Sequence, residues 1–423
     1  MTKLIKNGTI LLDGQCVKRD LLIESGRLVL ISPTINLPEG ASPDDVYDAT
    51  GLTILPGLVD VHVHFREPGF SYKETIETGS KAAAHGGYTT VCTMPNLNPV
   101  PDTLAHVEVQ LQKIEETALI EVQPYASITM GQKGAGTLVD FKALKDKVVA
   151  FSDDGCGVQS EALMLEAMRQ VAPLNKIIVA HCEDNTLIHG GYIHEGIYAK
   201  THHHLGICSR SEWQQIERDI NLVRQTGCAY HICHISTKES VELIRQAKKE
   251  GLPVTCETAP HYLLLTENDL KEEGRFKMNP PLRSNEDQAA LILGIQDGTI
   301  DCISTDHAPH TQEEKSKGLE KSAFGIVGLE TAFPLMYTYL VERDLISFSQ
   351  LLDLLSFNAR RIFSLGAAYE EGSRADLAFF DLQQKYKIAS SEFFSQGKST
   401  PFEGWDVQGK IKATMVGGEL LMF

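Results

Sequence analysis

The chain alternates short apolar runs with longer amphipathic stretches between residues 58 and 310. Each apolar run is rich in β-branched residues and ends in polar ones, and the stretch that follows carries apolar residues at helical spacing. Strands that are apolar throughout and alternate with helices are typical of a parallel sheet covered on both faces. The eight runs span residues 58–65, 88–96, 121–128, 148–155, 176–184, 229–236, 253–261 and 300–310.

Eight strand–helix units in about 300 residues predict a (β/α)8 TIM-type barrel rather than an open doubly wound sheet. No GxGxxG motif opens the first unit, which argues against a dinucleotide-binding fold. Residues 1–55 and 366–423 have short strand-like runs instead of strong helices, so we expect them to form one small β-sandwich domain from both chain termini. The catalytic barrel then spans residues 56–365, with Pro56–Gly57 and residues 366–374 as the links.

Composition narrows the classes of partner. The 423 residues include 39 Lys and Arg against 56 Asp and Glu, a formal charge of −17, which disfavours nucleic acid as the main partner. We find no secretory signal at the N-terminus, and no apolar run approaches the roughly 20 residues that a membrane helix needs. Nine cysteines without a CxxC pair suit reduced thiols, so we expect a cytoplasmic protein.

Histidine and aspartate recur where the predicted strands end. His62 and His64 lie two residues apart in the first strand, so their side chains point to the same face. The later strands end in Asp153–Asp154, His181, His234 and Asp306. Barrel strands bring their carboxyl ends to one mouth, and imidazole and carboxylate ligands suit zinc. The pattern therefore predicts a divalent metal centre at that mouth.

The motifs around these residues resemble those of the dihydroorotases in the amidohydrolase superfamily. They are DVHVHFREPG, TMPN, FSDDG, AHCED, CHIST, MNPPLR and STDHAPH, and the resemblance extends over the whole chain. It implies a zinc-dependent enzyme that interconverts N-carbamoyl-L-aspartate and L-dihydroorotate in pyrimidine synthesis. It also implies a homodimer, and it leaves association with aspartate transcarbamoylase open.

The resemblance further implies a role for each polar residue. His62, His64 and Asp306 would hold one zinc ion, His181 and His234 a second, and Asp154 would bridge both. Asp306 would also be the catalytic general base and acid. Strand alternation alone does not choose between Asp153 and Asp154 as the bridge, because the chain can already be turning there.

Arg66 follows the two histidines, and its planar guanidinium matches a carboxylate. By resemblance, the substrate contacts are His64, Arg66, Asn96, Asn279, His310, and the backbone at Phe324 and Gly325. Two plainer interpretations stay open. Arg66 could form a surface salt bridge with Glu67 or Glu74, and Asn279 could be a turn residue before two prolines.

Two alternative functions also stay open. Hydantoinases and allantoinases resemble this chain but bridge their metals with a carboxylated lysine at the end of strand four, whereas Lys147 here lies at that strand's start. A non-catalytic partner of aspartate transcarbamoylase is the second alternative, and it would be expected to lack metal ligands. Separately, the polar segment 310–325 is expected to be a mobile lid, because little apolar area would hold its middle.

Overall fold

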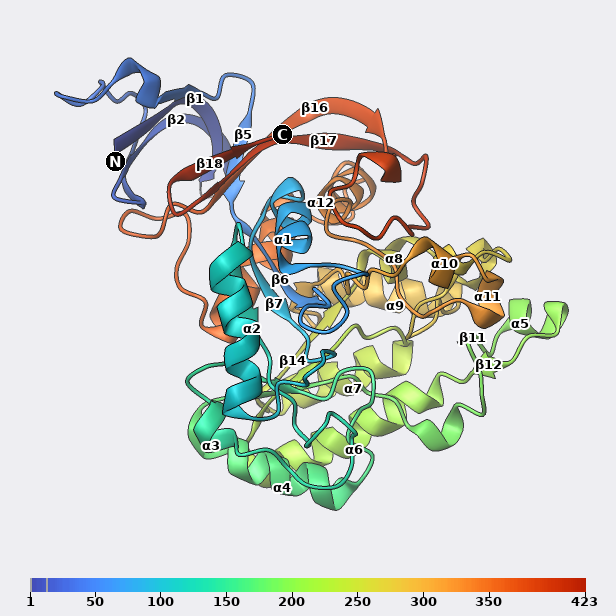
Figure 1. The fold of residues 1–423 in the computed structure, drawn as a ribbon. Coiled ribbons are helices and arrows are strands. Elements are labelled where there is room, and N and C mark those ends of the chain that lie inside the picture. Colours follow the sequence, from blue (N-terminus) through green and yellow to red (C-terminus); the bar gives the residue numbers. More distant parts are fainter. Residues whose placement is uncertain (1, 13) are drawn as a thin grey trace.

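Parallel strands form a closed barrel in the computed structural model, which describes residues 2–12 and 14–423 (Figure 1). The barrel strands are β6 (Leu58–Val63), β7 (Tyr88–Thr93), β8 (Glu121–Pro124), β9 (Phe151–Ser152), β10 (Ile177–Ala180), β13 (Ala229–Ile232), β14 (Val254–Thr258) and β15 (Cys302–Ile303). They form two sheets, β6-β7-β8 and β15-β14-β13-β10-β9. Single parallel bridges, Ala126 with Phe151 and Val63 with His307, join the sheets into a ring.

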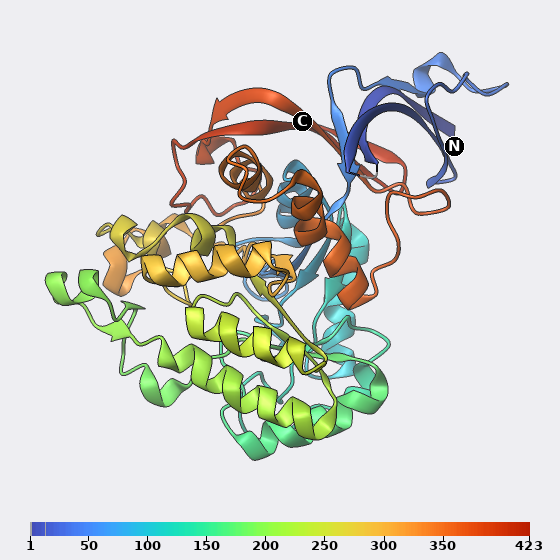
Figure 2. The same ribbon diagram turned by 180° about the vertical axis from the view of Figure 1, so that it is seen from behind.

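Helices cover the outside of the barrel (Figure 2). The longer ones are α1 (Ile76–His85), α2 (Leu104–Thr117), α4 (Glu161–Val171), α6 (Arg210–Thr226), α7 (Lys238–Lys249) and α9 (Asn285–Gln296). The shorter ones are α3 (Phe141–Leu144), α5 (Ile197–His202), α8 (Pro260–Leu264), α10 (Gln312–Lys315), α11 (Gly318–Lys321), α12 (Ala332–Met336), α13 (Phe348–Leu352) and α14 (Asn358–Phe363). Side-chain oxygens of Thr75, Ser160 and Thr237 cap the starts of α1, α4 and α7, which satisfies backbone N–H groups that a helix leaves free.

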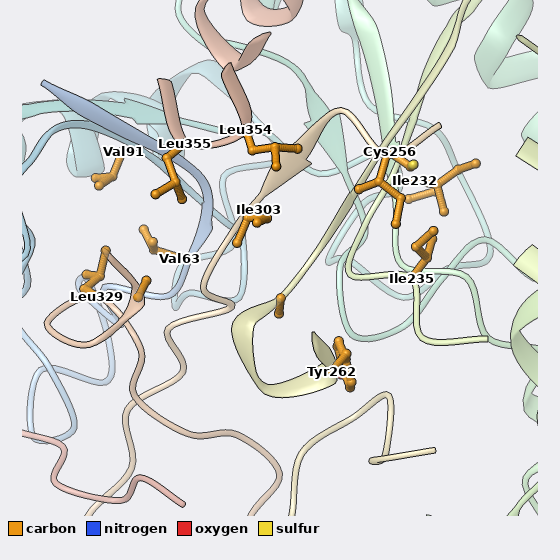
Figure 3. Packing of buried hydrophobic residues seen from close by; sticks show 14 of the residues in the cluster. Val63, Val91, Ile232, Ile235, Cys256, Tyr262, Ile303, Leu329, Leu354 and Leu355 are labelled. Carbon is orange, nitrogen blue, oxygen red and sulfur yellow. The ribbon is translucent and has the colours of Figure 1, made fainter. Parts of the chain in front are cut away.

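The core lies between the strands and these helices. Figure 3 shows Val63, Val91 and Ile303 from three barrel strands beside Leu354 and Leu355 from the helical segment before α14. All five side chains are at most 2% exposed. Burying one such side chain contributes about 1.5–3 kcal/mol, so this layer stabilises the ring on which the site is built.

Strands from both ends of the chain share one curved sheet beside the barrel (Figure 1). Its members are β1 (Thr2–Leu12), β2 (Gln15–Glu24), β3 (Arg27–Ser32), β4 (Val46–Asp48), β5 (Thr53–Pro56), β16 (Leu377–Lys387), β17 (Asp406–Val416) and β18 (Glu419–Met422). The order is β18-β17-β16-β5-β1-β2-β3, and β4 pairs with β1. The predicted fold class, a (β/α)8 barrel with a β-sandwich domain built from both termini, is confirmed.

Several local features differ from the sequence prediction. The fourth barrel strand covers only Phe151–Ser152, because the chain turns at the aspartates that follow. An excursion with β11 (Ile193–His194), α5 and β12 (Gly206–Ile207) extends away from the barrel (Figure 1). Segment 310–325, which was expected to be a loop, contains α10 and α11 and buries Leu319 and Lys315. Within the described ranges, no helix is long and apolar enough to cross a membrane.

Candidate metal centre and substrate pocket

Six of the predicted residues meet at the carboxyl ends of the barrel strands. They are His62 in β6, His64 after it, Asp154 after β9, His181 after β10, His234 after β13 and Asp306 after β15. Potential ligand atoms lie within 4.8 Å of one another in three overlapping groups: His62 with His64 and Asp306, Asp154 with His181 and His234, and His62 with Asp154 and Cys233. Every member is buried, and buried groups of this kind need hydrogen-bond partners, opposite charges or a metal ion.

Asp154 lies at the centre of this cluster. Its Oδ1 is 3.4 Å from His62 Nε2, 3.7 Å from His181 Nδ1 and 3.6 Å from His234 Nε2. Its Oδ2 is 3.6 Å from His64 Nε2. Asp154 Oδ1 and His62 Nε2 are both buried without a hydrogen-bond partner. One carboxylate therefore faces the His62–His64 pair and the His181–His234 pair.

These separations fit a shared cation better than they fit hydrogen bonds. Two ligands at about 2.1 Å from a tetrahedral zinc ion lie about 3.4 Å from each other. The distances from Asp154 Oδ1 to three imidazole nitrogens, 3.4–3.7 Å, match that value. His181 Nδ1 and His234 Nε2 are 3.0 Å apart, and a deprotonated imidazole nitrogen in either position could bind a metal ion. The donor set therefore suits a divalent metal.

The Asp153 carboxylate points away from the cluster, toward the loop after β8. Its Oδ1 accepts hydrogen bonds from the N–H groups of Ile128 (2.8 Å) and Thr129 (3.1 Å), and its Oδ2 accepts one from Gly134 (3.1 Å). This carboxylate holds the loop after β8, and it contacts none of the six clustered side chains. Of the two neighbouring aspartates, Asp154 is the one whose carboxylate points into the cluster.

The backbone at three site residues is strained. Arg66, His234 and Asp306 have φ angles of 55°, 30° and 49°, in a region that non-glycine residues seldom adopt. Each such residue costs about 1–3 kcal/mol and persists only where the surrounding structure holds it. All three residues lie just after barrel strands, at the mouth where the polar groups gather.

The charges of the cluster set the ionisation of Asp306. Its Oδ1 is 3.1 Å from His64 Nε2 and 3.5 Å from His62 Nε2. Burial alone would raise the pKa of Asp306, but the His64 hydrogen bond and the imidazole charges lower it to about 2. Asp306 is therefore a carboxylate at neutral pH and can accept a proton.

Arg66 borders a cavity of about 310 Å³ beside the cluster, lined by Arg66, Phe70, Lys73, Asn96, Leu97 and Gln132. Its Nε donates to the Pro309 carbonyl at 3.3 Å, and its Nη2 is 3.4 Å from His310 Nε2. Glu67 and Glu74, the candidate salt-bridge partners, are engaged elsewhere: Glu67 accepts from Ile76 N–H, and Glu74 from Ser395 Oγ. The guanidinium thus faces the cavity.

The remaining predicted contacts surround the same mouth. Asn96 donates to the Asp154 carbonyl at 2.8 Å, and Asn279 donates to both Glu183 oxygens at 3.1 Å. The amide oxygens of both asparagines are buried without a partner. A Cβ at Gly325, whose φ is +126°, would lie 2.7 Å from Ala308 Cβ and 3.3 Å from His310 Nε2. Only glycine fits there.

Four further residues of this region were not predicted from the sequence: Lys73, Gln132, Cys233 and Glu257. Glu257 Oε1 is 2.6 Å from His62 Nδ1, and Cys233 Sγ lies within reach of His62 and Asp154. Gln132 donates to the Asp154 carbonyl at 2.7 Å. A glutamate inside an apolar buried strand was the one available signal, because such a charge requires a partner.

Several named proteins align with this chain over nearly its full length. A dihydroorotase from Staphylococcus epidermidis is 52% identical over 422 residues, 99% of each chain. A dihydroorotase from Shouchella clausii is 51% identical over 420 residues, 97% of this chain and 96% of the relative. The chain belongs to the dihydroorotase family. A family model described as dihydro-orotase-like also matches residues 51–240 of this dihydroorotase-family chain.

Solved structures show the same fold in neighbouring families. An L-hydantoinase (dihydropyrimidinase) from Arthrobacter aurescens has a TM-score of 0.88 and 27% identity, covering 100% of this chain and 96% of that one. A dihydropyrimidinase from Brevibacillus agri has a TM-score of 0.86 at 22% identity, covering 100% of this chain and 95% of its own. This chain thus shares its fold with an L-hydantoinase and a dihydropyrimidinase.

Proposed function

We propose that this protein is a zinc-dependent dihydroorotase that interconverts N-carbamoyl-L-aspartate and L-dihydroorotate in the cytoplasm. The observation that carries the proposal is that Arg66 faces the cavity beside the buried histidine–aspartate cluster. A guanidinium fork binds a carboxylate, and dihydroorotate carries one beside its cyclic amide. The relatives named dihydroorotase support the same conclusion.

Two divalent ions would be held by the clustered side chains. In this proposal His62, His64 and Asp306 would hold one ion, His181 and His234 would hold the other, and Asp154 would contact both. When bound, the metals would polarise a carbonyl and lower the pKa of water to about 7. An aspartate bridge does this without the carboxylated lysine of the hydantoinase-like alternative.

Asp306 is the proposed general base and acid. Its carboxylate takes a proton from the water that attacks the ring carbonyl, and it then donates that proton to the departing ring nitrogen. In the reverse direction Asp306 starts protonated and the steps run backwards. His64, whose Nε2 is 3.1 Å from Asp306 Oδ1, keeps this carboxylate aimed at the reacting atoms.

The substrate would lie between two sets of polar groups. Arg66, Asn96 and His310 bind its carboxylate, at the cavity beside the metals. Asn279 and the backbone at Phe324–Gly325 meet the amide edge of the ring, and His64 contacts the substrate from the metal side. The buried amide oxygen of Asn279, which has no hydrogen-bond partner, could accept from a ring N–H. Asn96 would contact the carboxylate through its amide nitrogen, which has a second hydrogen besides the one donated to the Asp154 carbonyl.

The test compares dihydroorotate with dihydrouracil, which lacks the carboxylate. Metal-loaded protein, assayed without any transcarbamoylase, should strongly prefer dihydroorotate. Arg66→Ala should lower kcat/KM for dihydroorotate about 10- to 100-fold and barely change that for dihydrouracil. Arg169→Ala, at an exposed helix position, is the matched control. A preference for dihydrouracil would favour the hydantoinase-like alternative, and inactivity on both at full metal content would favour a non-catalytic role.

A further inference from the structure

Both ring nitrogens of His310 have polar neighbours. Nε2 is 2.7 Å from the Phe324 carbonyl oxygen and 3.4 Å from Arg66 Nη2. A carbonyl oxygen can only accept, so the hydrogen lies on His310 Nε2. The Arg66 contact then joins two donors: the Nε2 hydrogen already points to the Phe324 carbonyl, and Arg66 Nη2 finds no acceptor on His310. A carboxylate placed beside them would accept from Arg66 Nη2 and share the Nε2 hydrogen with the Phe324 carbonyl.

The opposite nitrogen faces an ammonium group. Lys73 Nζ is 3.3 Å from His310 Nδ1, and Glu314 Oε1 holds the same Nζ at 2.8 Å. Burial, together with the charges of Arg66, Lys73 and Lys315, lowers the pKa of His310 to about 3, so the ring is neutral at pH 7. A neutral ring with its hydrogen on Nε2 offers Nδ1 as an acceptor, and an ammonium can only donate.

We propose that Lys73 is a positioning residue, which donates a hydrogen bond to His310 Nδ1 and thereby fixes the Nε2–H tautomer that faces the substrate carboxylate. The inference rests on the proposed function only for the identity of that carboxylate. The tautomer itself follows from contacts in the protein. Lys73 also lines the cavity beside Arg66, so its charge adds to the field that attracts an anion.

Glu314 explains why the lysine is needed. Its Oε2 is 3.5 Å from His310 Nδ1, where a carboxylate would favour a proton on that nitrogen. Lys73 pairs with Glu314 and supplies the donor itself, so Nδ1 stays free of hydrogen. The charged groups around the ring are thus Arg66 and Lys73 from the loop after β6, and Glu314 and Lys315 from α10. With Lys73 removed, Glu314 would draw a proton to Nδ1.

The first test reads the tautomer directly by ¹⁵N NMR of histidine side chains in metal-loaded, ligand-free protein. The His310 signal is assigned by its loss in His310→Gln. We expect Nε2–H in the wild type and in the control Lys142→Met, which changes an exposed lysine of α3. Lys73→Met should move the proton to Nδ1 or raise the His310 pKa, and Lys73→Arg should restore the wild-type signal. A proton on Nδ1 in the wild-type protein would overturn the proposal. An unchanged His310 signal in Lys73→Met would also overturn it.

The second test is a double-mutant cycle on dihydroorotate turnover. Lys73→Met should raise KM about tenfold and change kcat less than about threefold, because carboxylate binding is lost without loss of the chemical step. In a His310→Ala background the same change should alter KM less than about twofold, since the lysine acts through the imidazole. An undiminished effect in that background would mean that Lys73 binds substrate itself. Wild-type protein inactive on dihydroorotate would refute the proposed function, and the NMR result would still decide the tautomer.

Discussion

His62 Nδ1 lies 2.6 Å from Glu257 Oε1, and the other nitrogen of that ring faces Asp154 and Asp306 at the mouth of the barrel. The carboxylate of Glu257 also accepts from Ser304 Oγ at 2.7 Å. A carboxylate behind a metal-binding imidazole fixes the tautomer and the ring orientation, and it raises the basicity of the ligand nitrogen.

Replacing Glu257 with Gln should therefore weaken metal binding about 10- to 100-fold, although Glu257 touches no metal itself. Competition with a chelator measures the affinity directly, without an activity assay. Glu115→Gln, at an exposed position of α2, is the control. Equal metal affinities in the two variants would show that Glu257 only fills the barrel interior.

Substitution of the two neighbouring aspartates, Asp153 and Asp154, should have different effects. Asp154→Asn should lose metal and activity, because it removes the charge that faces both histidine pairs. Asp153→Asn should keep metal but lower the free energy of unfolding by about 1–3 kcal/mol, since the carboxylate accepts three backbone hydrogen bonds. Metal content and urea unfolding, measured on both variants, separate the effects. The reverse ranking would move the bridge to Asp153.

Asp306→Asn should lower kcat about 10²- to 10⁴-fold in both directions, because an amide cannot shuttle a proton. The comparison is made at equal metal content, so that a loss of metal is not mistaken for a loss of chemistry. Turnover within about tenfold of the wild type would assign the proton transfer to another group.

Lys315 should make stability depend on pH. It is buried, its Nζ donates to the carbonyls of Lys277 and Ala323, and burial with the nearby Lys277 charge lowers its pKa from 10.5 to about 7. Between those values the unfolded chain binds more protons than the folded protein, so stability rises with pH. Relative to Lys315→Met, the wild type should gain up to about 1.4 kcal/mol per pH unit above pH 7. Urea unfolding from pH 7 to 9 tests this, with Lys142→Met as control, and parallel curves for wild type and Lys315→Met would contradict it.

The pattern of the sequence was enough to predict the barrel and the location of its polar mouth. Apolar strands alternating with helices leave few other arrangements, and parallel strands bring His62, His181 and Asp306 to the same end. The curved sheet followed from strand-like runs at both chain ends. These features could be predicted because the spacing of apolar residues shows which face of each strand or helix is buried.

Contacts that depend on turns, or that join residues far apart in the sequence, could not be predicted. Glu257 meets His62 across 195 positions, and Lys73 meets His310 across 237. The aspartates after β9 are distinguished only by a turn, and the two short helices of segment 310–325 form where Leu319 and Lys315 are buried. Such features depend on loop geometry and on partners far along the chain, which periodicity does not encode.

The sheet shared by both chain ends has a consequence for synthesis on the ribosome. β5 pairs with β1 on one side and with β16 on the other, and roughly 320 residues separate β5 from β16 along the chain. At about 5–20 residues per second, β5 waits on the order of 15 to 65 seconds for its second neighbour. During that interval its free edge can pair with other chains, so the nascent protein is most open to aggregation or chaperone binding while the barrel is being translated.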